Sequence, residues 1–386
     1  MARNIILITD GVRLKIKNVP RKKYDNYRIL RFQKQDLKTF KAHAYPYRIQ
    51  LEPTNICNLK CAACPVANKK LNRPPKHMTL EEFKGIMDDI SDYLLNITFW
   101  DWGEPFMNPQ LPNMIKHATD HGITSTTSTN AHFLKDEKYL ERILTSGLTI
   151  LFVAIDATSK QAYQKFRGAG DPSELIKDFK NLVRLKKKLK SKTLIAIRLV
   201  LTKDNEKERD KMRRLAKKLG ADIFAVKAIT FFHGMKHDNK ILPKDQRNRR
   251  LHYKDGKRVK VKNVCNRHWL IPNIHSNGMV VPCWHDYAED VQLGNVYEKP
   301  LTEIWNSAKY RQYRKDKHDQ VSNPFCDACA YNYKFSKDAE FNEITYLKHN
   351  LIQNIYNYLF EVIRKKRETS TVFKKFSNRI HSIFLR

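Results

Sequence analysis

This 386-residue sequence is short of negative charge, of spare cysteines and of long apolar stretches. No stretch is long enough to cross a bilayer, and the apolar run near Met1 is too short for a signal peptide. The seven cysteines fall into two groups, so none is left over for a structural disulfide. We therefore expect a protein of the reducing cytoplasm, in an organism or niche that is low in oxygen.

Lysine and arginine number 73 against 40 aspartates and glutamates, which gives a net charge of +33. This excess favours anionic partners: phosphorylated substrates, nucleic acid or an anionic membrane surface. The basic residues are spread over several expected helices and do not surround a recognition motif, so nucleic acid is the weaker interpretation. The length and the 41% hydrophobic content suffice for one large domain and a smaller one.

The first cysteine group has the spacing C-x3-C-x2-C, formed by Cys57, Cys61 and Cys64, and it follows an expected buried strand. Three thiolates on one loop can converge on one metal centre, and thiolates are the usual ligands of iron–sulfur clusters. In a cubane of four irons, three thiolates leave one iron open for chemistry. Zinc or redox thiols are the alternative, but no histidine or fourth cysteine lies nearby in the sequence.

This cysteine spacing resembles the cluster motif of the radical SAM enzyme family. The resemblance implies that the open iron of a [4Fe–4S] cluster binds S-adenosylmethionine through its amino and carboxylate groups. It further implies that the reduced cluster splits the sulfonium, and that the resulting 5′-deoxyadenosyl radical takes a hydrogen atom from the substrate. An electron donor such as flavodoxin or ferredoxin is then needed.

Strand and helix patterns alternate from about residue 46 to 230. Strands are expected at 48–54, 96–102, 123–128, 149–155, 193–201 and 222–228, and helices at 79–93, 111–120, 135–146, 173–190 and 206–219. Repeated units of this length imply a parallel sheet with right-handed crossovers. Six strands indicate an α/β fold, a partial (β/α)6 TIM-like barrel. The resemblance implies the same fold, with the active site at the carboxyl ends of the strands.

The segment after the second expected strand resembles the family motif Gly-Glu-Pro, which holds the amino group of S-adenosylmethionine. Here the motif is Gly103, Glu104 and Pro105, and Trp102 stands where the commoner form has another glycine. An ammonium needs carbonyl oxygens and a carboxylate, and glycine lets the backbone come close. An ordinary turn after a strand is the alternative interpretation.

Polar residues also follow the next strands. Ser128 and Asn130 are placed to reach a ribose, and Asp156 with Arg167 resembles the family's strand-end acid and its Tyr…Arg-Gly pattern. The fork of Arg167 fits the methionyl carboxylate, although a surface arginine at a helix end is an equal alternative. Arg198 is a further candidate for cofactor binding.

Two further positions bear on the cofactor. Lys227, at the end of the sixth expected strand, has weaker support than the candidates above. Ala63 stands where family members carry an aromatic residue, so Phe99 or Trp102 is expected to cover the adenine, or the adenine is held differently.

The second cysteine group lies near the C-terminus, within a pattern that resembles the SPASM/twitch auxiliary-cluster domain. The pattern has a Gly-x4-Cys hairpin at Gly278, a Leu-Gly-Asn turn at Gly294 and an Ile-Trp helix ending at Trp305. Its cysteines are Cys265, Cys283, Cys326 and Cys329. They would close all four irons of a second [4Fe–4S] cluster, whose expected work is electron transfer or shaping of the substrate pocket. A zinc ribbon is the alternative, but only one C-x2-C pair is present.

These patterns divide the chain into five parts. They are a hairpin and an irregular basic arm (1–45), a radical SAM core (46–233), a basic linker (234–262), a small α+β auxiliary-cluster domain (263–335) and an amphipathic basic helical tail (336–386). The tail repeats apolar residues every four positions from Leu347 to Ile363 and then becomes basic. Packing on the barrel or in a dimer is its first interpretation, and peripheral contact with an anionic membrane is the second.

The expected function is a radical SAM oxidation of a small sugar-like or aminocyclitol-like molecule, because the four-cysteine layout resembles that of radical dehydrogenases acting on such alcohols. A maturase acting on a peptide or protein is the alternative, since SPASM relatives include such enzymes. A nucleic-acid-binding or RNA-modifying protein is the alternative from another class. No catalytic acid or base is identified from the sequence.

Overall fold

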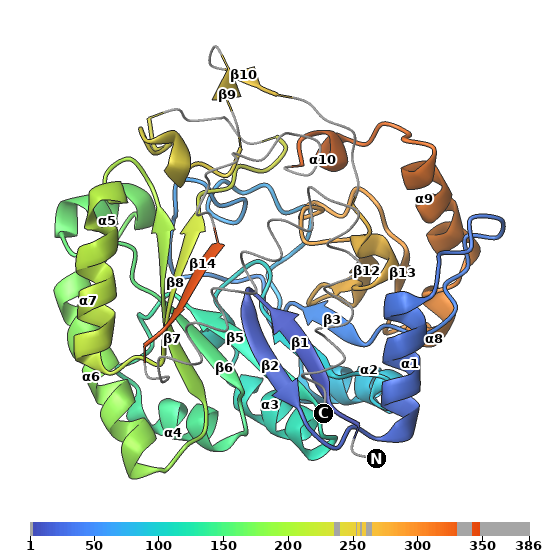
Figure 1. Cartoon of the computed structure of the whole chain (residues 1–386), viewed down its shortest axis with the longest axis horizontal. Helices are drawn as coiled ribbons and strands as arrows, with labels where there is room; N and C mark the ends of the chain where they lie inside the picture. Colours follow the sequence, from blue (N-terminus) through green and yellow to red (C-terminus); the bar gives the residue numbers. More distant parts are fainter. Residues whose placement is uncertain are drawn as a thin grey trace, which may run out of the picture.

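The computed structural model describes residues 3–234, 240–251, 253–254, 257–259, 265–329 and 342–347. At its centre lies a curved sheet in which β3 to β8 are parallel and in chain order, with helices on the outer face (Figure 1). These strands are β3 (Arg48–Leu51), β4 (Asn96–Phe99), β5 (Thr124–Thr129), β6 (Ile150–Ala154), β7 (Leu194–Leu201) and β8 (Ile223–Ala228). All six expected strands are confirmed, and so is the partial barrel.

The helices on the outer face also agree with the expected positions. They are α2 (Leu80–Ile90), α3 (Leu111–Asp120), α4 (Glu137–Thr145), α6 (Pro172–Lys188) and α7 (Arg209–Leu219). A capping box at Thr79 and Glu82 starts α2, as predicted. The structure adds α5 (Lys160–Arg167), in a connection where no helix was expected.

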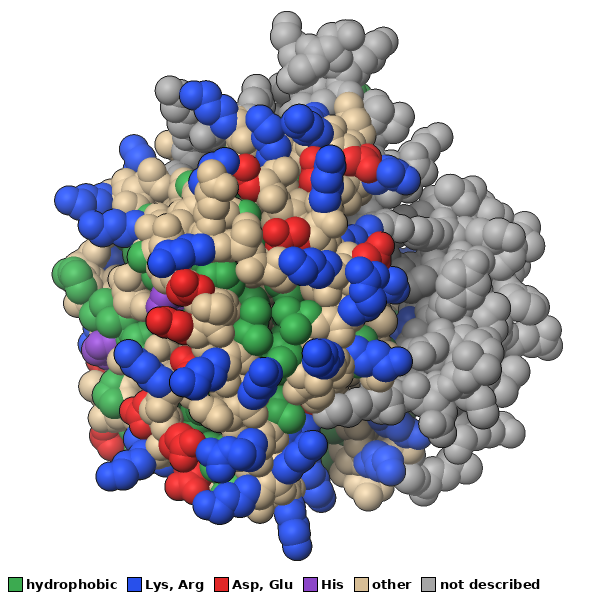
Figure 2. All heavy atoms as spheres, turned by 90° about the vertical axis from the view of Figure 1, so that its left-hand side faces the viewer, with side chains coloured by type: hydrophobic (Ala, Val, Ile, Leu, Met, Phe, Trp, Pro, Cys, Tyr) green, Lys and Arg blue, Asp and Glu red, His purple; other side chains and the backbone are tan. Residues whose placement is uncertain are grey.

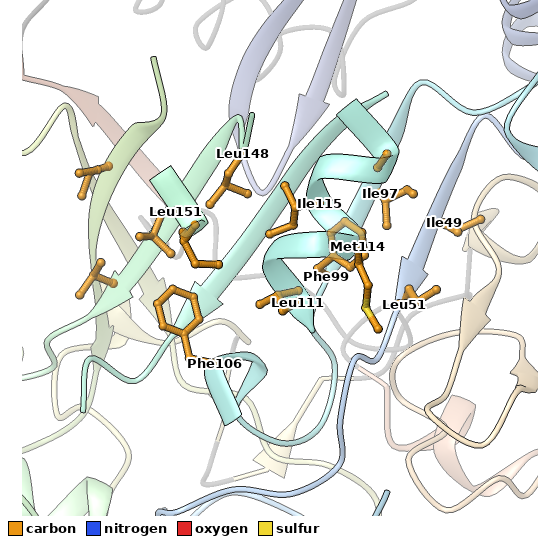
Figure 3. Close-up of a cluster of buried hydrophobic side chains, with 14 of the residues drawn as sticks. Ile49, Leu51, Ile97, Phe99, Phe106, Leu111, Met114, Ile115, Leu148 and Leu151 are labelled. Atoms are coloured by element: carbon orange, nitrogen blue, oxygen red, sulfur yellow. The ribbon is translucent and has the colours of Figure 1, made fainter. Parts of the chain in front are cut away.

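Successive side chains of each strand alternate between the helices and the inside of the barrel. Phe99 and Leu151 point outward and belong to one buried cluster with Met114 and Ile115 of α3 (Figure 3). The inward positions of β5 carry hydroxyls instead, such as Thr126. The main core therefore lies outside the sheet, and the inner face carries a smaller apolar cluster together with polar side chains.

The expected N-terminal hairpin consists of β1 (Ile5–Thr9) and β2 (Val12–Ile16), and it lies against the inner face of the sheet (Figure 1). Val12 and Leu14 pack against Phe152 of β6. At the turn, the Asp10 carboxylate lies 2.5 Å from the Nζ atom of Lys227 on β8. The hairpin thus fills part of the barrel interior.

The prediction that residues 20–45 are irregular is wrong over their first half. Arg21–Phe32 forms α1, because Tyr24, Tyr27 and Leu30 recur at helical spacing and pack on the cluster beneath the hairpin. The ring of Tyr27 meets that of Tyr47 edge-on, with 4.9 Å between the centroids. Apolar periodicity in this arm is masked in the sequence by the surrounding basic residues.

The second part of the chain continues the same sheet. β11 (Asn273–Ile274) pairs in parallel with β3, and β12 (Met279–Val281) and β13 (Gly294–Asn295) follow outward. The helices of this part are α8 (Leu301–Ile304), α9 (Ala308–His318) and α10 (Pro324–Asp327). The expected hairpin at Gly278, the turn at Gly294 and the short helix before the buried Trp305 are confirmed.

The described part of the expected linker packs on the barrel. It contains η3 (Gln246–Asn248) and the short pair β9 (Tyr253–Lys254) and β10 (Lys257–Arg258). The backbone N–H groups of Lys244 and Asp245 donate to the carboxylate of Glu206, at the start of η2 (Glu206–Glu208). This segment is therefore held against the connection between β7 and α7.

At the other end of the sheet, β14 (Asn342–Tyr346) pairs antiparallel with β8. The expectation of a helical tail from residue 336 is wrong over these five residues, because a strand satisfies the open edge of β8. Residues 348–386, with most of the expected amphipathic pattern, lie outside the described residues. No helix in the described ranges has both the length and the apolar character needed to cross a bilayer.

The hairpin contact predicts a stability effect. Leu14 is 7% exposed, so Leu14→Ala should lower the free energy of unfolding by about 2–5 kcal/mol through lost burial and an unfilled cavity. Lys15→Ala, at the next and exposed position, is the control and should change it by less than about 0.5 kcal/mol. Anaerobic urea denaturation measures both. Equal effects of the two substitutions would show that the hairpin does not pack as described.

Candidate functional site

The loop after β3 carries Cys57, Cys61 and Cys64, as expected from the sequence. The backbone N–H of Ala62 donates to the carbonyl oxygen of Phe166 in α5 at 3.0 Å, which fixes the middle of the loop. The backbone N–H of Cys64 donates to the carbonyl oxygen of Cys61 at 3.1 Å. The three thiols thus project from a loop that is tied to the barrel wall, and we name residues 57–64 the cluster loop.

The cysteine sulfurs are not gathered as tightly as the ligands of a single zinc ion. In the described part of the chain, which includes all seven cysteines, no three cysteine sulfurs lie within 4.8 Å of one another. A tetrahedral zinc site with 2.3 Å bonds needs sulfurs roughly 3.8 Å apart, whereas the thiolates of a cubane bind separate irons. Burial raises the pKa of Cys57 to about 12, so its proton leaves only when a metal takes the thiolate.

Gly103 and Glu104, after β4, lie directly against the backbone that leads into the cluster loop. The N–H of Glu104 donates to the carbonyl oxygen of Ile56 at 2.8 Å. Gly103 has φ of +93°, and a Cβ atom there would come within 2.4 Å of the carbonyl oxygen of Thr54. Pro105 then starts η1 (Pro105–Met107). Only glycine fits this approach, which brings the Glu104 carboxylate close enough to act on the Cys57 thiol.

The Glu104 carboxylate is held by backbone donors. Its two oxygens accept from the N–H of Asn130 at 2.7 Å and from the N–H of Phe106 at 3.1 Å. Burial raises the pKa of Glu104 to about 7, although these donors and Arg167 oppose the shift. The side chain of Asn130 in turn donates to Asn58 of the cluster loop at 2.7 Å. A buried acid with a fixed orientation is therefore available to an ammonium group.

Arg167 is partly buried, with 14% of its side chain exposed, and it is paired, so it is not a surface arginine. Its Nε atom donates to Asp156 at 2.5 Å, and its Nη1 atom lies 3.5 Å from the Sγ atom of Cys61. The other oxygen of Asp156 accepts from the N–H of Val200 at 2.7 Å. Because Arg167 already has a carboxylate partner, it is a weaker partner for a second one than the sequence suggested.

Arg198, unlike Arg167, has no hydrogen-bonded carboxylate among the described residues. It donates to the hydroxyl of Ser128 and lies over the rings of Phe152 and Trp100, with 5.4 and 5.8 Å to the ring centroids. Its direct contacts among the described residues are neutral, whereas Asp10, Asp156 and Glu104 act on its charge from farther away. Burial lowers the pKa of Arg198. The structure thus brings Ser128, Asn130, Asp156, Arg167 and Arg198 to the inner face, near the carboxyl ends of β5, β6 and β7.

Of the two aromatic residues expected to cover the adenine, Phe99 lies away from the cluster loop, and Trp102 stays a prediction. Phe99 points into the outer core against Phe83, at 5.6 Å between ring centroids, and so it does not face the cluster loop. Trp102 is buried edge-on against Phe232 at 4.9 Å. Ala63 packs instead on the cluster that contains Phe166 and Phe231. This packing could not be deduced from the sequence, because Phe166 and Phe231 lie far from Ala63 along the chain.

The second cysteine group also comes together in space. Burial raises the pKa of Cys283, and the other three thiols of the group raise it further, which shows that the four lie near one another. The backbone N–H of Arg267, at the start of η4 (Arg267–Trp269), lies 3.5 Å from the Sγ atom of Cys265. The hydroxyl of Tyr313 lies 3.5 Å from the Sγ atom of Cys326. Four thiols can close every iron of a cubane.

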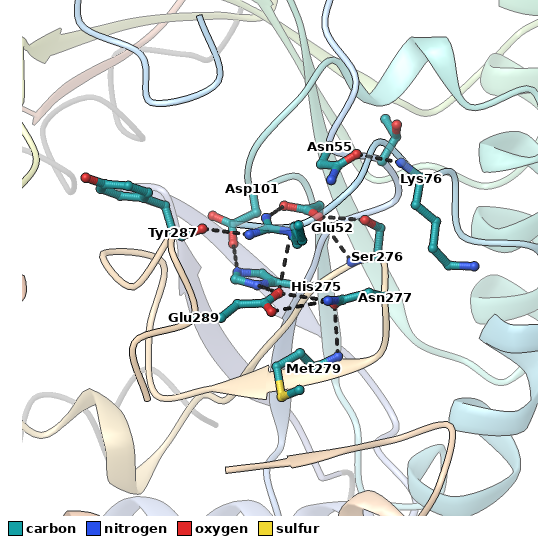
Figure 4. Close-up of polar contacts among 12 residues, drawn as sticks. Glu52, Asn55, Lys76, Asp101, His275, Ser276, Asn277, Met279, Tyr287 and Glu289 are labelled. Atoms are coloured by element: carbon teal, nitrogen blue, oxygen red, sulfur yellow. Dashed lines mark hydrogen bonds and ion pairs between the residues drawn. The ribbon is translucent and has the colours of Figure 1, made fainter. Parts of the chain in front are cut away.

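Buried charges join the carboxyl ends of β3 and β4 to the second part of the chain (Figure 4). Glu52 accepts from the Nη2 atom of Arg73 at 2.6 Å and from the hydroxyl of Ser276 at 2.7 Å. Arg73 also donates to the carbonyl oxygen of Tyr287 at 2.6 Å. We name this set the Glu52 network; its members are Glu52, Arg73, Asp101, His275, Ser276 and Glu289.

His275 is the second cation of the network. Its Nδ1 atom lies 2.9 Å from Glu289 and its Nε2 atom 3.3 Å from Asp101. Burial opposes its charge, but Glu52, Asp101 and Glu289 together raise the pKa of His275 to about 9. Glu52, Asp101 and His275 also bring three ligand atoms within 4.8 Å. Because Arg73 and the His275 proton already occupy these carboxylates, the network is a set of ion pairs rather than a cation site.

Sequence reasoning missed this network and also Arg267. The members of the network are spread along the chain from Glu52 to Glu289, and each charged member alone resembles a surface charge. The one available indication was an acid inside the buried segment Leu51-Glu52-Pro53, since a buried carboxylate needs a partner. The partner itself could not be deduced.

The charge on His275 predicts a dependence of stability on pH. A histidine whose pKa is about 9 when folded stabilises the fold fully below its unfolded value near 6.5. That contribution, about 3 kcal/mol by linkage, should disappear as the pH rises from about 6.5 through 9. His275→Gln should flatten this decline in the free energy of unfolding, and the exposed His43→Gln should keep it. A wild-type decline retained in His275→Gln would contradict the assignment.

Comparison with known protein families gives two matches. The model of the radical SAM superfamily matches residues 51–216, and that of the SPASM iron–sulfur cluster-binding domain matches residues 265–330. The first range contains the cluster loop, Glu104 and Arg198, and the second contains the other four cysteines. Both groups of thiols thus fall inside a matched domain.

Curated relatives extend over most of the chain. The AdoMet-dependent heme synthase of Methanosarcina barkeri is 25% identical over 324 residues, which are 74% of this chain and 89% of the relative. A tungsten-containing aldehyde ferredoxin oxidoreductase cofactor-modifying protein of Pyrococcus furiosus is 27% identical over 302 residues, 69% of this chain and 82% of the relative.

Solved structures share the fold. Streptococcus suis SuiB bound to S-adenosylmethionine has a TM-score of 0.57 at 18% identity, over 76% of this chain and 71% of that chain. The enzyme anSMEcpe with bound AdoMet has a TM-score of 0.55 at 16% identity, over 86% of this chain and 98% of that chain. The chain is therefore an enzyme that belongs to the radical SAM superfamily and carries a C-terminal SPASM iron–sulfur cluster-binding domain.

Proposed function

We propose that Cys57, Cys61 and Cys64 hold the [4Fe–4S] cluster that binds S-adenosylmethionine, and that the enzyme removes hydrogen from a substrate lying inside the barrel. The observation that carries this proposal is the joining of the cluster loop to the Glu104 segment by the hydrogen bond from Glu104 to Ile56. When bound, the cluster supplies one electron to the cofactor sulfonium, and a carbon radical results.

The residues around the loop have separate parts in holding the cofactor. Glu104 takes the amino group, because its carboxylate is fixed by two backbone donors. Arg198 takes the methionyl carboxylate, since its hydrogen bond among the described residues goes to the neutral hydroxyl of Ser128 and not to a carboxylate. Ser128 and Asn130 face the ribose. Arg167 is a positioning residue that links Asp156 to Cys61.

Cys265, Cys283, Cys326 and Cys329 would hold a second cluster, which would supply a one-electron acceptor close to the substrate. Loss of a hydrogen atom from the substrate, then of a proton and of one electron to that acceptor, would be a two-electron oxidation. A flavodoxin or ferredoxin supplies the electron that starts each turnover. Four thiolates leave this cluster without an open iron, which suits it to electron transfer rather than to binding.

The class of substrate is a separate and more specific proposal. The four-cysteine layout favours a net oxidation of a small, sugar-like molecule. A peptide or protein is the alternative, because relatives include a PqqA peptide cyclase, 30% identical over 122 residues, and SuiB solved with its precursor peptide SuiA. Production of a modified small molecule by the enzyme without any added peptide would favour the first class.

The surface gives little support to the alternative that the protein binds nucleic acid. On the face covered by α5, α6 and α7, basic side chains alternate with acidic and neutral ones (Figure 2). Several of the basic groups form ion pairs there, such as Arg184 with Glu137 at 2.7 Å. A solvated, mixed surface of this kind does not form a continuous phosphate-binding stripe. Contact of the basic tail with an anionic membrane remains a proposal from sequence.

Two cysteine variants separate the two clusters. Reconstituted wild-type enzyme should hold about eight irons, and Cys57→Ser and Cys283→Ser about four each. With dithionite and S-adenosylmethionine, Cys283→Ser should still form 5′-deoxyadenosine, because its cofactor site is intact, and Cys57→Ser should form none. Deoxyadenosine formation at the wild-type rate by Cys57→Ser, or stoichiometric zinc in place of iron, would overturn the proposal.

Gly103→Ala tests the contact between the Glu104 segment and the cluster loop. The added Cβ would lie within 2.4 Å of the Thr54 carbonyl oxygen at a φ that disfavours side chains, so the segment must move away from the loop. Affinity for S-adenosylmethionine should fall by at least about tenfold.

Gly85→Ala is the matched control for this substitution. A Cβ there meets nothing within 4 Å and lies inside α2, so affinity should not change and the helix should gain about 1 kcal/mol. Equal cofactor affinities for the two alanine variants, measured by equilibrium dialysis on reconstituted enzyme, would rule out a role for the Gly103 segment.

A further inference from the structure

A groove lies between the N-terminal hairpin and α1, which are neighbours in the fold (Figure 1). Its volume is about 970 Å³. Most of its lining residues are apolar or aromatic, namely Ile5, Ile6, Tyr24, Tyr27, Ile29 and Phe32. The charged residues of its wall are Asp25 and Arg28, and their charges are opposite. We name this feature the hairpin groove; its lining suits an apolar partner of little net charge.

Three large apolar side chains at the groove are exposed. Phe32 is 64% exposed and Ile29 39%, and both line the groove. Ile8 is 48% exposed and lies two positions beyond Ile6, on the same outward face of β1. These three are half of the six large apolar side chains that are exposed in the described ranges. Single exposed apolar residues are ordinary, whereas a group of them at one groove marks an interaction site.

The end of β14 lies against the other strand of the same hairpin. The hydroxyl of Tyr346 accepts from the backbone N–H of Arg13 in β2 at 3.0 Å, and Arg13 pairs with Ile8 of β1. Residues 348–386 therefore begin on the β2 side of the hairpin, and the groove is on its β1 side. Neighbouring strands are about 4.8 Å apart and an extended residue spans about 3.3 Å, so residues 348–350 are long enough to cross the hairpin.

The sequence that follows has the character that the groove requires. Leu347 already packs on the core of the barrel, so the apolar repeat that is still available starts at Leu351 and ends at Ile363. A helix of this length would be about 20 Å long and α1 is about 18 Å long, so the two match. Its apolar face would carry Leu351, Ile355, Leu359 and Ile363, and its polar face Gln353, Asn354, Asn357 and Glu361.

Charge and connection also favour this segment. Glu361 is the one acidic or basic residue from 351 to 363, and the basic run starts at Arg364. A nearly neutral segment suits a wall with one acid and one base. A segment tethered beside its site has an effective concentration on the order of millimolar, so it is favoured over a second copy of the chain.

We propose that residues 351–363 form a helix whose apolar face occupies the hairpin groove of the same chain, against Ile6, Ile29 and Phe32. An amphipathic helix binds an apolar groove in this way, through side chains spaced by three or four residues. The contact fastens the hairpin, whose turn places Asp10 beside Lys227 inside the barrel. The inference is independent of the proposed radical chemistry, because no residue of the groove belongs to the cofactor site.

Photo-cross-linking from position 32 tests the occupant directly. The variant Phe32→p-benzoylphenylalanine is prepared as full-chain, anaerobically reconstituted enzyme and irradiated, and its products are mapped by peptide mass spectrometry. We expect cross-links to residues 351–363 in a product with the mass of one chain. Lys187→p-benzoylphenylalanine, on the exposed side of α6, is the control, and its yield of this product should be at least about tenfold lower.

Two substitutions in the tail separate its apolar face from its polar face. Ile355→Asp puts a charge on the apolar face and should lower the yield of the cross-link from position 32 by about tenfold or more. Asn357→Asp introduces the same residue about 200° around the helix, on the polar face, and should leave the yield unchanged. Iron content and 5′-deoxyadenosine formation should be the same in both variants, which excludes unfolding as the cause of a lost cross-link.

Several results would overturn the inference. A cross-linked product with the mass of two chains would assign the groove to a second copy. No cross-link from position 32, cross-links only to other segments, or equal losses in Ile355→Asp and Asn357→Asp would show that the apolar face does not dock there. The expected cross-link in an enzyme that forms no 5′-deoxyadenosine would support the docking of the tail and remove the proposed reaction.

Discussion

The buried ion pair between Glu52 and Arg73 is the interaction on which the site depends. It lies at the end of β3, five residues before Cys57, and Ser276 and Tyr287 of the second part bind the same two side chains. Removing one member of such a pair leaves an uncompensated charge, at a cost of about 3–5 kcal/mol. The cluster loop, the Glu104 segment and the SPASM domain are therefore positioned by one set of contacts, and none can shift alone.

The barrel could be predicted because its information is local. Period-two strands, helical repeats and the capping box at Thr79 lie within short windows, and so do C-x3-C-x2-C and Gly103-Glu104-Pro105. The Glu52 network could not be predicted, because its members come from distant segments. Asp156 and Arg167 were identified together, but their mutual pairing was missed because Arg167 was assigned to the cofactor. The helix α1 and the strand β14 were also missed, since basic residues and tertiary pairing outweighed the local pattern there.

The hairpin and the second part of the chain give the barrel its particular interior. Val12 and Leu14 fill the lower inner face with apolar groups, and above them Asp10 and Lys227 begin a polar layer. Gln50 connects this layer to Asp101 at 3.2 Å and to Arg267 at 2.6 Å. The inner face of the barrel is thus lined by three segments that are far apart in sequence.

The order of strands across the sheet has a consequence for biosynthesis. Both outer positions are taken by late segments, β13 (Gly294–Asn295) at one end and β14 (Asn342–Tyr346) at the other. On the ribosome, β3 and β8 therefore emerge long before the strands that cover their edges, and until then both present unpaired backbone groups. The edge of β3 therefore stays unpaired until residues 273–274 have been made, and that of β8 until residues 342–346 have been made.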